Sequence, residues 1–241
     1  MIGYLRNRAT RPERMDEEQA GGEELRQAYQ HLRRLNGIFG AASPVRYGVN
    51  KLWHEAGRPK HLTVLDIGAG SGDVNRSLLR WSDRQGVELR ITAVDSMSEA
   101  CDEARRMYHD EPRVSIEQAN LFELPHRCAD IVTASQFVHH FLDSELPVVV
   151  SKLVHASRIG IVINDIHRHI VPWAAVWLTT RLISSNPYIR HDGPLSVAKG
   201  FRREDWRRLR DDLLLSEVEV SWRPLFRYAV LIRSRSPGEW G

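Results

Sequence analysis

The sequence predicts an α/β protein built on a doubly wound, mostly parallel β-sheet. From residue 61 onward, short apolar runs alternate with helical patterns, as in parallel strands joined by crossover helices. A glycine-rich turn at 66–72, DIGAGSG, joins the first of these runs to the helix after it. Two alternating runs near the end, 217–222 and 226–233, are separated by a short turn at Pro224, which predicts an antiparallel hairpin that closes the sheet.

Seven strands and several helices follow from these patterns. The strands are expected at 62–68, 88–96, 114–120, 128–135, 157–166, 217–222 and 226–233. Helices are expected at 23–39, 44–56, 73–81, 98–108 and 202–215, and one more ends near residue 153. Ser98 is of a type that caps helices, so we expect it to be the N-cap of its helix. The two leading helices would either lie over a ligand site or pack on the sheet.

The chain of 241 residues suits one domain with additions. No repeat or low-complexity linker divides it. We expect residues 1–56 to form an N-terminal helical cap and residues 57–241 to form the core. Residues 169–201, inserted between the fifth strand and the last helix, are expected to form a helical lid.

Composition and charge indicate which partners and metal sites to expect. The formal net charge is +3, and nearly all of the 34 basic residues are arginine. Because these arginines are spread over the whole chain rather than along one stripe, we expect no nucleic-acid partner. Cys101 and Cys128 do not form a metal-type CxxC pair, so we expect no metal site.

Neither a secretory signal nor a membrane span is expected from the sequence. The first residues lack an apolar segment. The longest apolar stretch, 170–183, is too short to span a bilayer and is broken by Thr179, Thr180 and Arg181. We therefore expect a soluble cytoplasmic protein without integral membrane association. The arginine-rich residues 6–14 could be a flexible tail, a lid over the site or a contact in a homodimer.

The glycine turn and an acidic residue after it predict a nucleotide-type site. Glycines permit a tight turn and close approach of the backbone to a ligand. Asp95 ends the second strand, about 20 residues after the turn, which is the spacing at which a carboxylate meets ribose hydroxyls. The alternative is that the glycine turn has only a structural role and that Asp95 is an ordinary surface residue.

Local charge favours S-adenosylmethionine (SAM) over a nicotinamide dinucleotide. The glycines at 68, 70 and 72 do not have the GxGxxG spacing of dinucleotide sites. Asp73 follows at once, and its carboxylate would repel a pyrophosphate. SAM instead carries a cationic sulfonium, which suits an acid such as Asp66 beside the turn.

These motifs resemble those of class I SAM-dependent methyltransferases. DIGAGSG is similar to their first motif, and Asp95 in AVDSM to their ribose-binding acid. QANLFELP at 118–125 resembles their third motif, with Asn120 where Asp is usual, and ADIVTASQFVHHF at 129–141 resembles their fourth strand and the loop after it. The resemblance covers about residues 45–235 and implies a Rossmann-like seven-stranded fold.

The resemblance also implies a set of cofactor contacts. The backbone of the turn would line the methionine part of SAM, and Asp66 would orient the turn or bind the amino group of SAM indirectly. Asp95 would hold the ribose, Met97 and its neighbour Ser96 would pack on the adenine, and Asn120 would hydrogen-bond the adenine edge. The full set is Asp66, Gly68, Ala69, Gly70, Asp95, Ser96, Met97, Asn120, Leu121, Ser135 and Gln136.

Histidines at strand ends are candidates for a general base. Methyl transfer mainly requires alignment of donor and acceptor, and a base assists when the acceptor is a phenol. His139 and His140 follow the fourth strand, and His167 follows the fifth, with Asp165 as its expected orienting partner. Ordinary hydrogen-bonded loop histidines are the alternative.

The lid sequence points to an aromatic acceptor. Its first half is apolar, and we expect an amphipathic helix that turns Trp173 and Trp177 toward a hydrophobic substrate; a core-packing helix is the alternative. Arg190 and His191 could orient a hydroxyl or carboxylate. The pattern NDIHRH…RHDGPLS…GF resembles the ubiquinone/menaquinone-type branch, which implies a lipophilic phenol or quinol and a place in secondary metabolism.

The leading hypothesis is therefore O-methylation of a small aromatic molecule. C-methylation of a quinone precursor is an alternative that no sequence feature separates from it. A SAM-binding assembly or regulatory protein without catalysis is another, because the glycine turn and Asp95 indicate cofactor binding rather than turnover.

Overall fold

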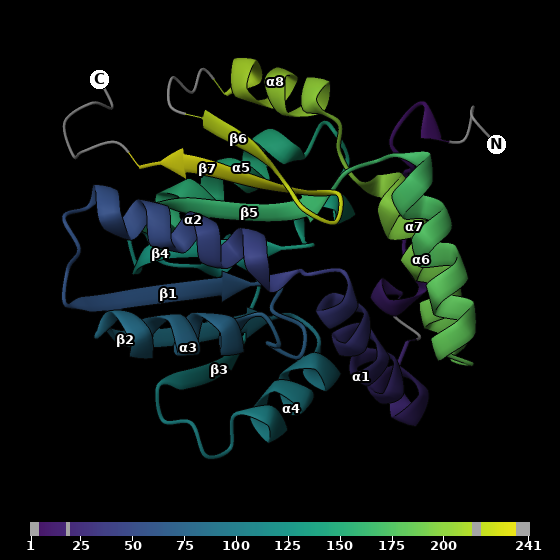
Figure 1. Ribbon diagram of the computed structural model, residues 1–241, viewed down its shortest axis with the longest axis horizontal. Coiled ribbons are helices and arrows are strands. Elements are labelled where there is room, and N and C mark those ends of the chain that lie inside the picture. Colours follow the sequence, from purple (N-terminus) through teal and green to yellow (C-terminus); the bar gives the residue numbers. More distant parts are fainter. Residues whose placement is uncertain (1–4, 18–19, 214–217, 235–241) are drawn as a thin grey trace.

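The computed structural model describes residues 5–17, 20–213 and 218–234. It contains one seven-stranded sheet in the order β3-β2-β1-β4-β5-β7-β6 (Figure 1). The strands are β1 (His61–Ile67), β2 (Glu88–Asp95), β3 (Val114–Gln118), β4 (Ala129–Ser135), β5 (Ser157–Ile166), β6 (Val218–Arg223) and β7 (Arg227–Arg233). The first five run parallel, whereas β7 is antiparallel to both β5 and β6. The predicted doubly wound sheet and its closing hairpin are confirmed.

Helices cover both faces of the sheet because its strand residues alternate between two apolar surfaces. On one face, α2 (Ala42–Glu55) and α3 (Asn75–Gln85) pack over Val64, Ile131 and Val162. On the other face, α5 (Leu146–Ala156) and α8 (Arg203–Asp212) pack over the neighbouring strand positions, Leu65, Val132 and Ile161. The remaining helix beside the strands, α4 (Ser98–Met107), contacts β2 and β3.

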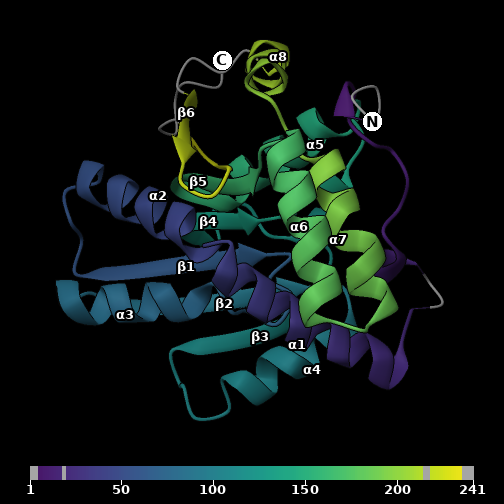
Figure 2. The ribbon, with the colours of Figure 1, turned by 45° about the vertical axis from the view of Figure 1, so that its right-hand side comes forward.

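Three further helices gather at the carboxyl ends of the parallel strands. They are α1 (Gly22–Ile38), α6 (Ile170–Ile183) and α7 (Pro187–Lys199), which Figures 1 and 2 show beyond the arrowhead of β1. The stretch before α1, residues 5–17, runs beside α7 and includes the short 3₁₀ helix η2 (Arg14–Asp16). This stretch is referred to below as the N-terminal strap. The helices and the strap thus meet at the end of the sheet where open α/β folds bind ligands.

Two local expectations are wrong. The N-cap of α4 is Met97, and the Ser98 hydroxyl donates to the carboxylate of Glu99 instead of capping the helix. Helix α6 is not amphipathic as expected, because only Pro172 and Thr180 are buried in it while other apolar side chains are exposed. Leu182, for example, is 75% exposed.

The predicted ends at Leu215 and Glu217 lie outside the described residues. Within the described part of the chain, no helix has both the length and the apolar character needed to cross a membrane.

Candidate functional site

The glycine turn after β1 adopts a backbone that needs glycine. Gly68 and Gly72 have φ of +62° and +73°, in the left-handed region that is unfavourable for other residues. A Cβ at Gly68 would lie 2.2 Å from Cδ2 of Phe137, and one at Gly72 would lie 2.9 Å from Cε2 of Tyr108. Tyr108 also donates its hydroxyl to the Gly72 carbonyl. The turn is therefore shaped by close contacts as well as by its own conformation.

A cavity of about 520 Å³ opens over this turn. It lies at the carboxyl ends of β1, β2 and β4, and α1, α7 and the N-terminal strap form its other walls. All eleven residues expected to contact the cofactor line it, namely Asp66, Gly68, Ala69, Gly70, Asp95, Ser96, Met97, Asn120, Leu121, Ser135 and Gln136.

Asp66 is buried at the start of the turn and holds it in place. Its carboxylate accepts hydrogen bonds from the Thr133 hydroxyl at 2.7 Å and the Asn75 amide at 2.8 Å. Burial raises the pKa of Asp66 to about 6, although these two hydrogen bonds oppose the shift. Asp66 is thus a carboxylate whose charge a nearby cation would stabilise.

Asp95 links the turn to the next loop. One carboxylate oxygen accepts from the Gly70 N–H at 2.8 Å, and the other accepts from the Met97 N–H at 3.0 Å. A carboxylate has about four acceptor positions, so each oxygen can still accept a bond from a ligand hydroxyl. Burial raises the pKa of Asp95, because desolvation disfavours its charged form.

Asn120 and Gln136 border the cavity with polar groups that already have protein partners. The side-chain oxygen of Asn120 accepts from the Phe122 N–H and caps the 3₁₀ turn η3 (Leu121–Glu123). Gln136 has a left-handed φ of +54°, and its amide donates to the side-chain oxygen of Asn36 at 2.6 Å. Positive φ in a non-glycine residue is costly and is frequent at functional sites.

His139 is fully buried between two carboxylates. Its Nδ1 lies 2.8 Å from Asp165, and its Nε2 lies 3.4 Å from Glu13 of the strap. Burial alone would lower its pKa, but Asp165 and Glu13 outweigh this effect and raise the pKa to about 9. His139 therefore holds its proton at neutral pH. The expected pairing of Asp165 with His167 is wrong, since Asp165 orients His139 instead.

The N-terminal strap closes the cavity through its own charged and polar groups. The Arg8 guanidinium donates to the carbonyls of His139 at 3.1 Å and Phe141 at 3.0 Å. The backbone N–H groups of Arg14 and Met15 each donate to the Asp192 carboxylate of α7 at 3.0 Å. These contacts place the strap, which includes the arginine-rich residues 6–14, against the site.

Glu13 occupies a buried position among cationic groups. It is 6% exposed, it accepts from the Ser196 hydroxyl at 3.0 Å, and it lies 3.6 Å from the Lys199 ammonium. Burial opposes its ionisation, yet His140, His139 and Lys199 lower its pKa to about 2. Glu13 is therefore a permanent anion in the wall of the cavity.

His140 is the accessible member of the histidine pair. Its imidazole lies 2.5 Å from the Asp16 carboxylate of the strap and stacks on the ring of His139 at 4.5 Å. Glu13, His139 and His140 place ligand atoms within 4.8 Å of one another, as a metal site requires. The Lys199 ammonium beside Glu13 disfavours a cation there.

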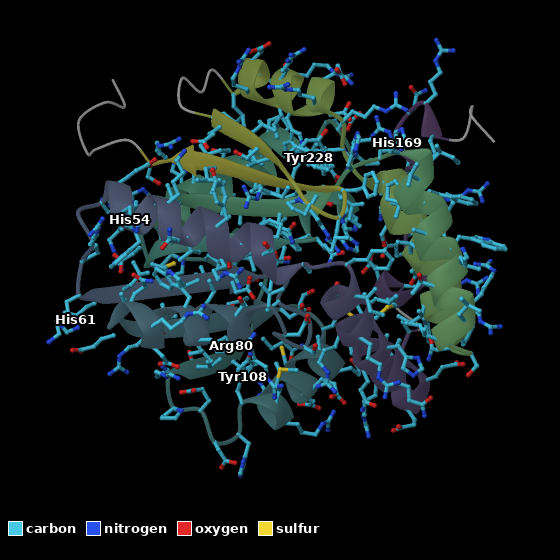
Figure 3. All side chains as sticks on the ribbon, in the orientation of Figure 1. His54, His61, Arg80, Tyr108, His169 and Tyr228 are labelled. Carbon is cyan, nitrogen blue, oxygen red and sulfur yellow. The ribbon has the colours of Figure 1, made fainter. Side chains whose placement is uncertain are left out.

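Other expected acceptor residues do not line the 520 Å³ cavity. Trp173, Trp177, Arg190 and His191 are all described, and none is part of its wall. Arg190 donates to the Ser184 carbonyl at 2.6 Å, and the Arg181 guanidinium stacks over Trp177 at 4.0 Å. His167 packs instead against His169 and Tyr228, both labelled in Figure 3.

Several wall residues were missed from the sequence. They are Glu13, Asp16, Tyr29, Asn36, Asp192, Ser196 and Lys199. They come from the strap, α1 and α7, and they reach the site only through long-range folding. The one sequence signal for them is the RHDGPLS segment, in which Asp192 directly follows the predicted Arg190 and His191.

Part of the chain matches a known protein family. Residues 64–160 match the family model described as a methyltransferase domain, and this part of the chain contains the glycine turn, Asp95 and the histidine pair. No curated protein matches the chain.

Solved structures with the same fold include several methyltransferases. A SAM-dependent methyltransferase from Aquifex aeolicus is 16% identical with a TM-score of 0.60, and 87% of this chain covers 98% of it. A putative S-adenosyl-L-methionine-dependent methyltransferase from Methanococcus maripaludis is 14% identical with a TM-score of 0.61, and 92% of this chain covers 99% of it. Human N-acetylserotonin methyltransferase, in complex with SAM, is 15% identical with a TM-score of 0.61, and the coverages are 89% and 57%.

The chain spans about half the length of some matched structures, such as 46% of the citrinin polyketide synthase CMeT domain. At these identities the likeness concerns the fold.

Proposed function

We propose that the protein is a SAM-dependent methyltransferase that methylates a hydroxyl of a lipophilic aromatic small molecule, a phenol or quinol. The observation that carries the cofactor part is Asp95, half-buried beside the glycine turn, where each of its oxygens accepts one backbone N–H and has acceptor positions left for a ligand. Asp66 also supports SAM as the cofactor, because a cationic ligand above the turn would favour the ionised form of the Asp66 carboxyl group. A dinucleotide phosphate in the same place would face Asp66, Asp73 and Asp95 together.

The residues at the strand ends fit SAM part by part. Asp95 would hold the ribose hydroxyls, Met97 and Leu121 would enclose the adenine, and the Gly68–Gly70 backbone would face the methionine portion. When bound, SAM supplies an activated methyl group. The protein then has to align an acceptor oxygen with that group and keep water out.

The acceptor would lie between the histidine pair and the helices of the cavity wall. Tyr29, Leu32, Leu35 and Ile189 give that side an apolar surface that suits an aromatic ring. A structural neighbour, an O-methyltransferase family 2 protein from Planctomyces limnophilus, was solved with the aromatic compound apigenin (16% identity, TM-score 0.52). It supports an aromatic acceptor by analogy of fold.

His140 is the proposed general base, and Asp16 its orienting partner. His139 is a poor proton acceptor because Asp165 and Glu13 hold its proton up to a pKa of about 9. His140 borders the same cavity, is partly exposed, and has a carboxylate on Nδ1 that leaves Nε2 for the acceptor proton. His139 would act as a fixed cation that stabilises the oxygen as it loses its proton.

The experiment that tests the proposal is methyl transfer from labelled SAM to phenols, quinols, carboxylic acids and small RNAs, with products resolved by mass spectrometry. Label on oxygen is the expected result. Label on a ring carbon would replace the proposal with C-methylation, as the name of another fold neighbour, CurJ carbon methyltransferase, describes for that protein. SAM binding without transfer to any acceptor would favour a non-catalytic role.

Variants then separate the roles of the two histidines. His140→Ala is expected to lower kcat by about 10²- to 10⁴-fold, the usual contribution of a general base, while SAM affinity stays close to wild type. His109→Ala is the matched control, because its exposed side chain pairs with Asp110 and is not part of the cavity wall. Full activity of His140→Ala would reject His140 as the base.

A further inference from the structure

Arg227, at the start of β7, is a buried cation with an unsatisfied donor. Its side chain is 4% exposed, and its Nε donates to the Phe39 carbonyl at 3.2 Å. Its Nη1 is buried without a hydrogen-bond partner. Buried guanidinium groups normally have every N–H paired, because an unpaired buried charge is costly.

The guanidinium borders a small apolar pocket that adjoins the cofactor cavity. This second pocket has a volume of about 50 Å³, room for one functional group rather than a ring, and Pro172, Val176 and Leu225 form its apolar walls. Ile166, the register partner of Arg227 on β5, also lines it. Six residues line both pockets: Leu32, Leu35, Asn36, Gln136, Gly193 and Ser196.

No described carboxylate forms an ion pair with Arg227. Asp165 is the carboxylate that most opposes the lowering of the Arg227 pKa, but its oxygens already accept from His139 and from the Ile166 N–H. Asp73 also attracts Arg227, and its carboxylate accepts from Asn36. Burial lowers the pKa of Arg227 to about 10, so it keeps its charge at neutral pH.

The turn that presents Arg227 is strained. Leu225 and Phe226 both have left-handed φ values, +61° and +57°, although neither is glycine. Such a conformation is unfavourable for residues other than glycine and persists where the surroundings enforce it, often at binding sites. Leu225 packs over Gly40 and lines the small pocket beside Arg227.

We propose that Arg227 binds an anionic oxygen of the methyl acceptor in the small pocket while the ring of the acceptor lies in the larger cavity. This inference rests on the proposed function and narrows its substrate class to acidic aromatic molecules. The anionic oxygen can belong to a carboxylate or to an ionised ring hydroxyl, since a guanidinium pairs with either. The polar pair Asn36 and Gln136, which lines both pockets, stands where the acceptor would pass from one to the other.

Calorimetric binding to the protein saturated with S-adenosylhomocysteine tests this inference. The probes are salicylate with its neutral counterpart salicylamide, and 4-nitrocatechol, which ionises near neutral pH, with catechol. In the wild-type protein, at least one anion is expected to bind about tenfold or more tightly than its neutral counterpart, as for a buried charge-assisted hydrogen bond. Preference for salicylate alone identifies a carboxylate, and preference for 4-nitrocatechol alone identifies an ionised hydroxyl.

Variants attribute the preference to Arg227. Arg227→Gln is expected to abolish it, and Arg227→Lys to retain part of it because the charge remains. Arg181→Gln, on the exposed side of α6, is the matched control and is expected to behave as wild type. The comparison of anion with neutral probe in the wild-type protein needs no variant, so it stands even if Arg227→Gln fails to fold.

The outcomes distinguish this inference from the proposed function. Equal or absent binding of anionic and neutral probes by the wild-type protein overturns the inference, and so does a preference that survives in Arg227→Gln. S-adenosylhomocysteine binding is measured first and separately. Its absence would reject the SAM-dependent function itself, whereas its presence without anion preference would reject only the role of Arg227.

Discussion

Protonation of His139 should make the stability of the protein depend on pH in the alkaline range. The pKa of His139 is raised from 6.5 to about 9 in the folded protein. One pKa unit corresponds to about 1.4 kcal/mol, so the charged pairings of His139 stabilise the fold by roughly 3 kcal/mol. Since the folded pKa lies above the unfolded value, this stabilisation is fully present below pH 6.5 and is lost as pH rises through 9.

Urea unfolding at about pH 6 and about pH 10 measures this effect. The wild-type free energy of unfolding should fall over this range, and His139→Asn should remove most of the His139 share of the fall. His109→Ala, an exposed histidine, should keep the wild-type slope. A His139→Asn variant with the same slope as wild type would refute the assignment of a buried histidinium between Asp165 and Glu13.

Three further predictions concern the cofactor side of the cavity. Asp95→Ala is expected to weaken SAM binding at least about tenfold in calorimetry, through loss of ribose contacts, and unchanged affinity would reject the ribose assignment. Gly68→Ala is expected to lose both stability and SAM binding, because the new Cβ would lie 2.2 Å from Phe137. Gly86→Ala is the control: Gly86 has a similar φ of +67° but open space around it, so thermal unfolding should show only the backbone cost of about 1–2 kcal/mol. SAM affinity is expected to rise from about pH 5 to pH 7 as Asp66, with a pKa of about 6, ionises; a flat profile, or one that Asp66→Asn leaves unchanged, would remove Asp66 from the cationic part of the site.

The cofactor side could be predicted from sequence because its determinants are local. The glycine turn, the strand before it and Asp95 lie within one βαβ unit, in which short-range patterns fix both the backbone and the register. The register of β1 on β2 pairs Ile67 with Val94, which brings the two strand ends together at the turn. The sequence motifs therefore predict eleven residues that line the folded cavity.

The acceptor side could not be predicted in the same way. Glu13 meets Lys199 and His139 across more than a hundred residues of chain, and neither composition nor periodicity encodes such contacts. The apolar pattern of α6 predicts a face turned inward, but a pattern specifies which side chains are apolar and not which neighbour covers them. In the structure α7 takes the place beside the cavity, and α6 lies behind it.

Gln136 lies between the cofactor side and the acceptor side of the site. Its backbone follows β4 directly, and its N–H donates to the Asn164 carbonyl of β5 at 2.7 Å, so the sheet fixes its position. Its side chain reaches away from the sheet to Asn36 on α1, and it lines both the cofactor cavity and the small pocket of Arg227. The strained φ of Gln136 is thus what turns a strand-end residue toward the helical wall. The proposed methyl transfer requires donor and acceptor to be aligned within a fraction of an ångström, and a residue anchored on the sheet and hydrogen-bonded to the helical wall is well placed to set that alignment.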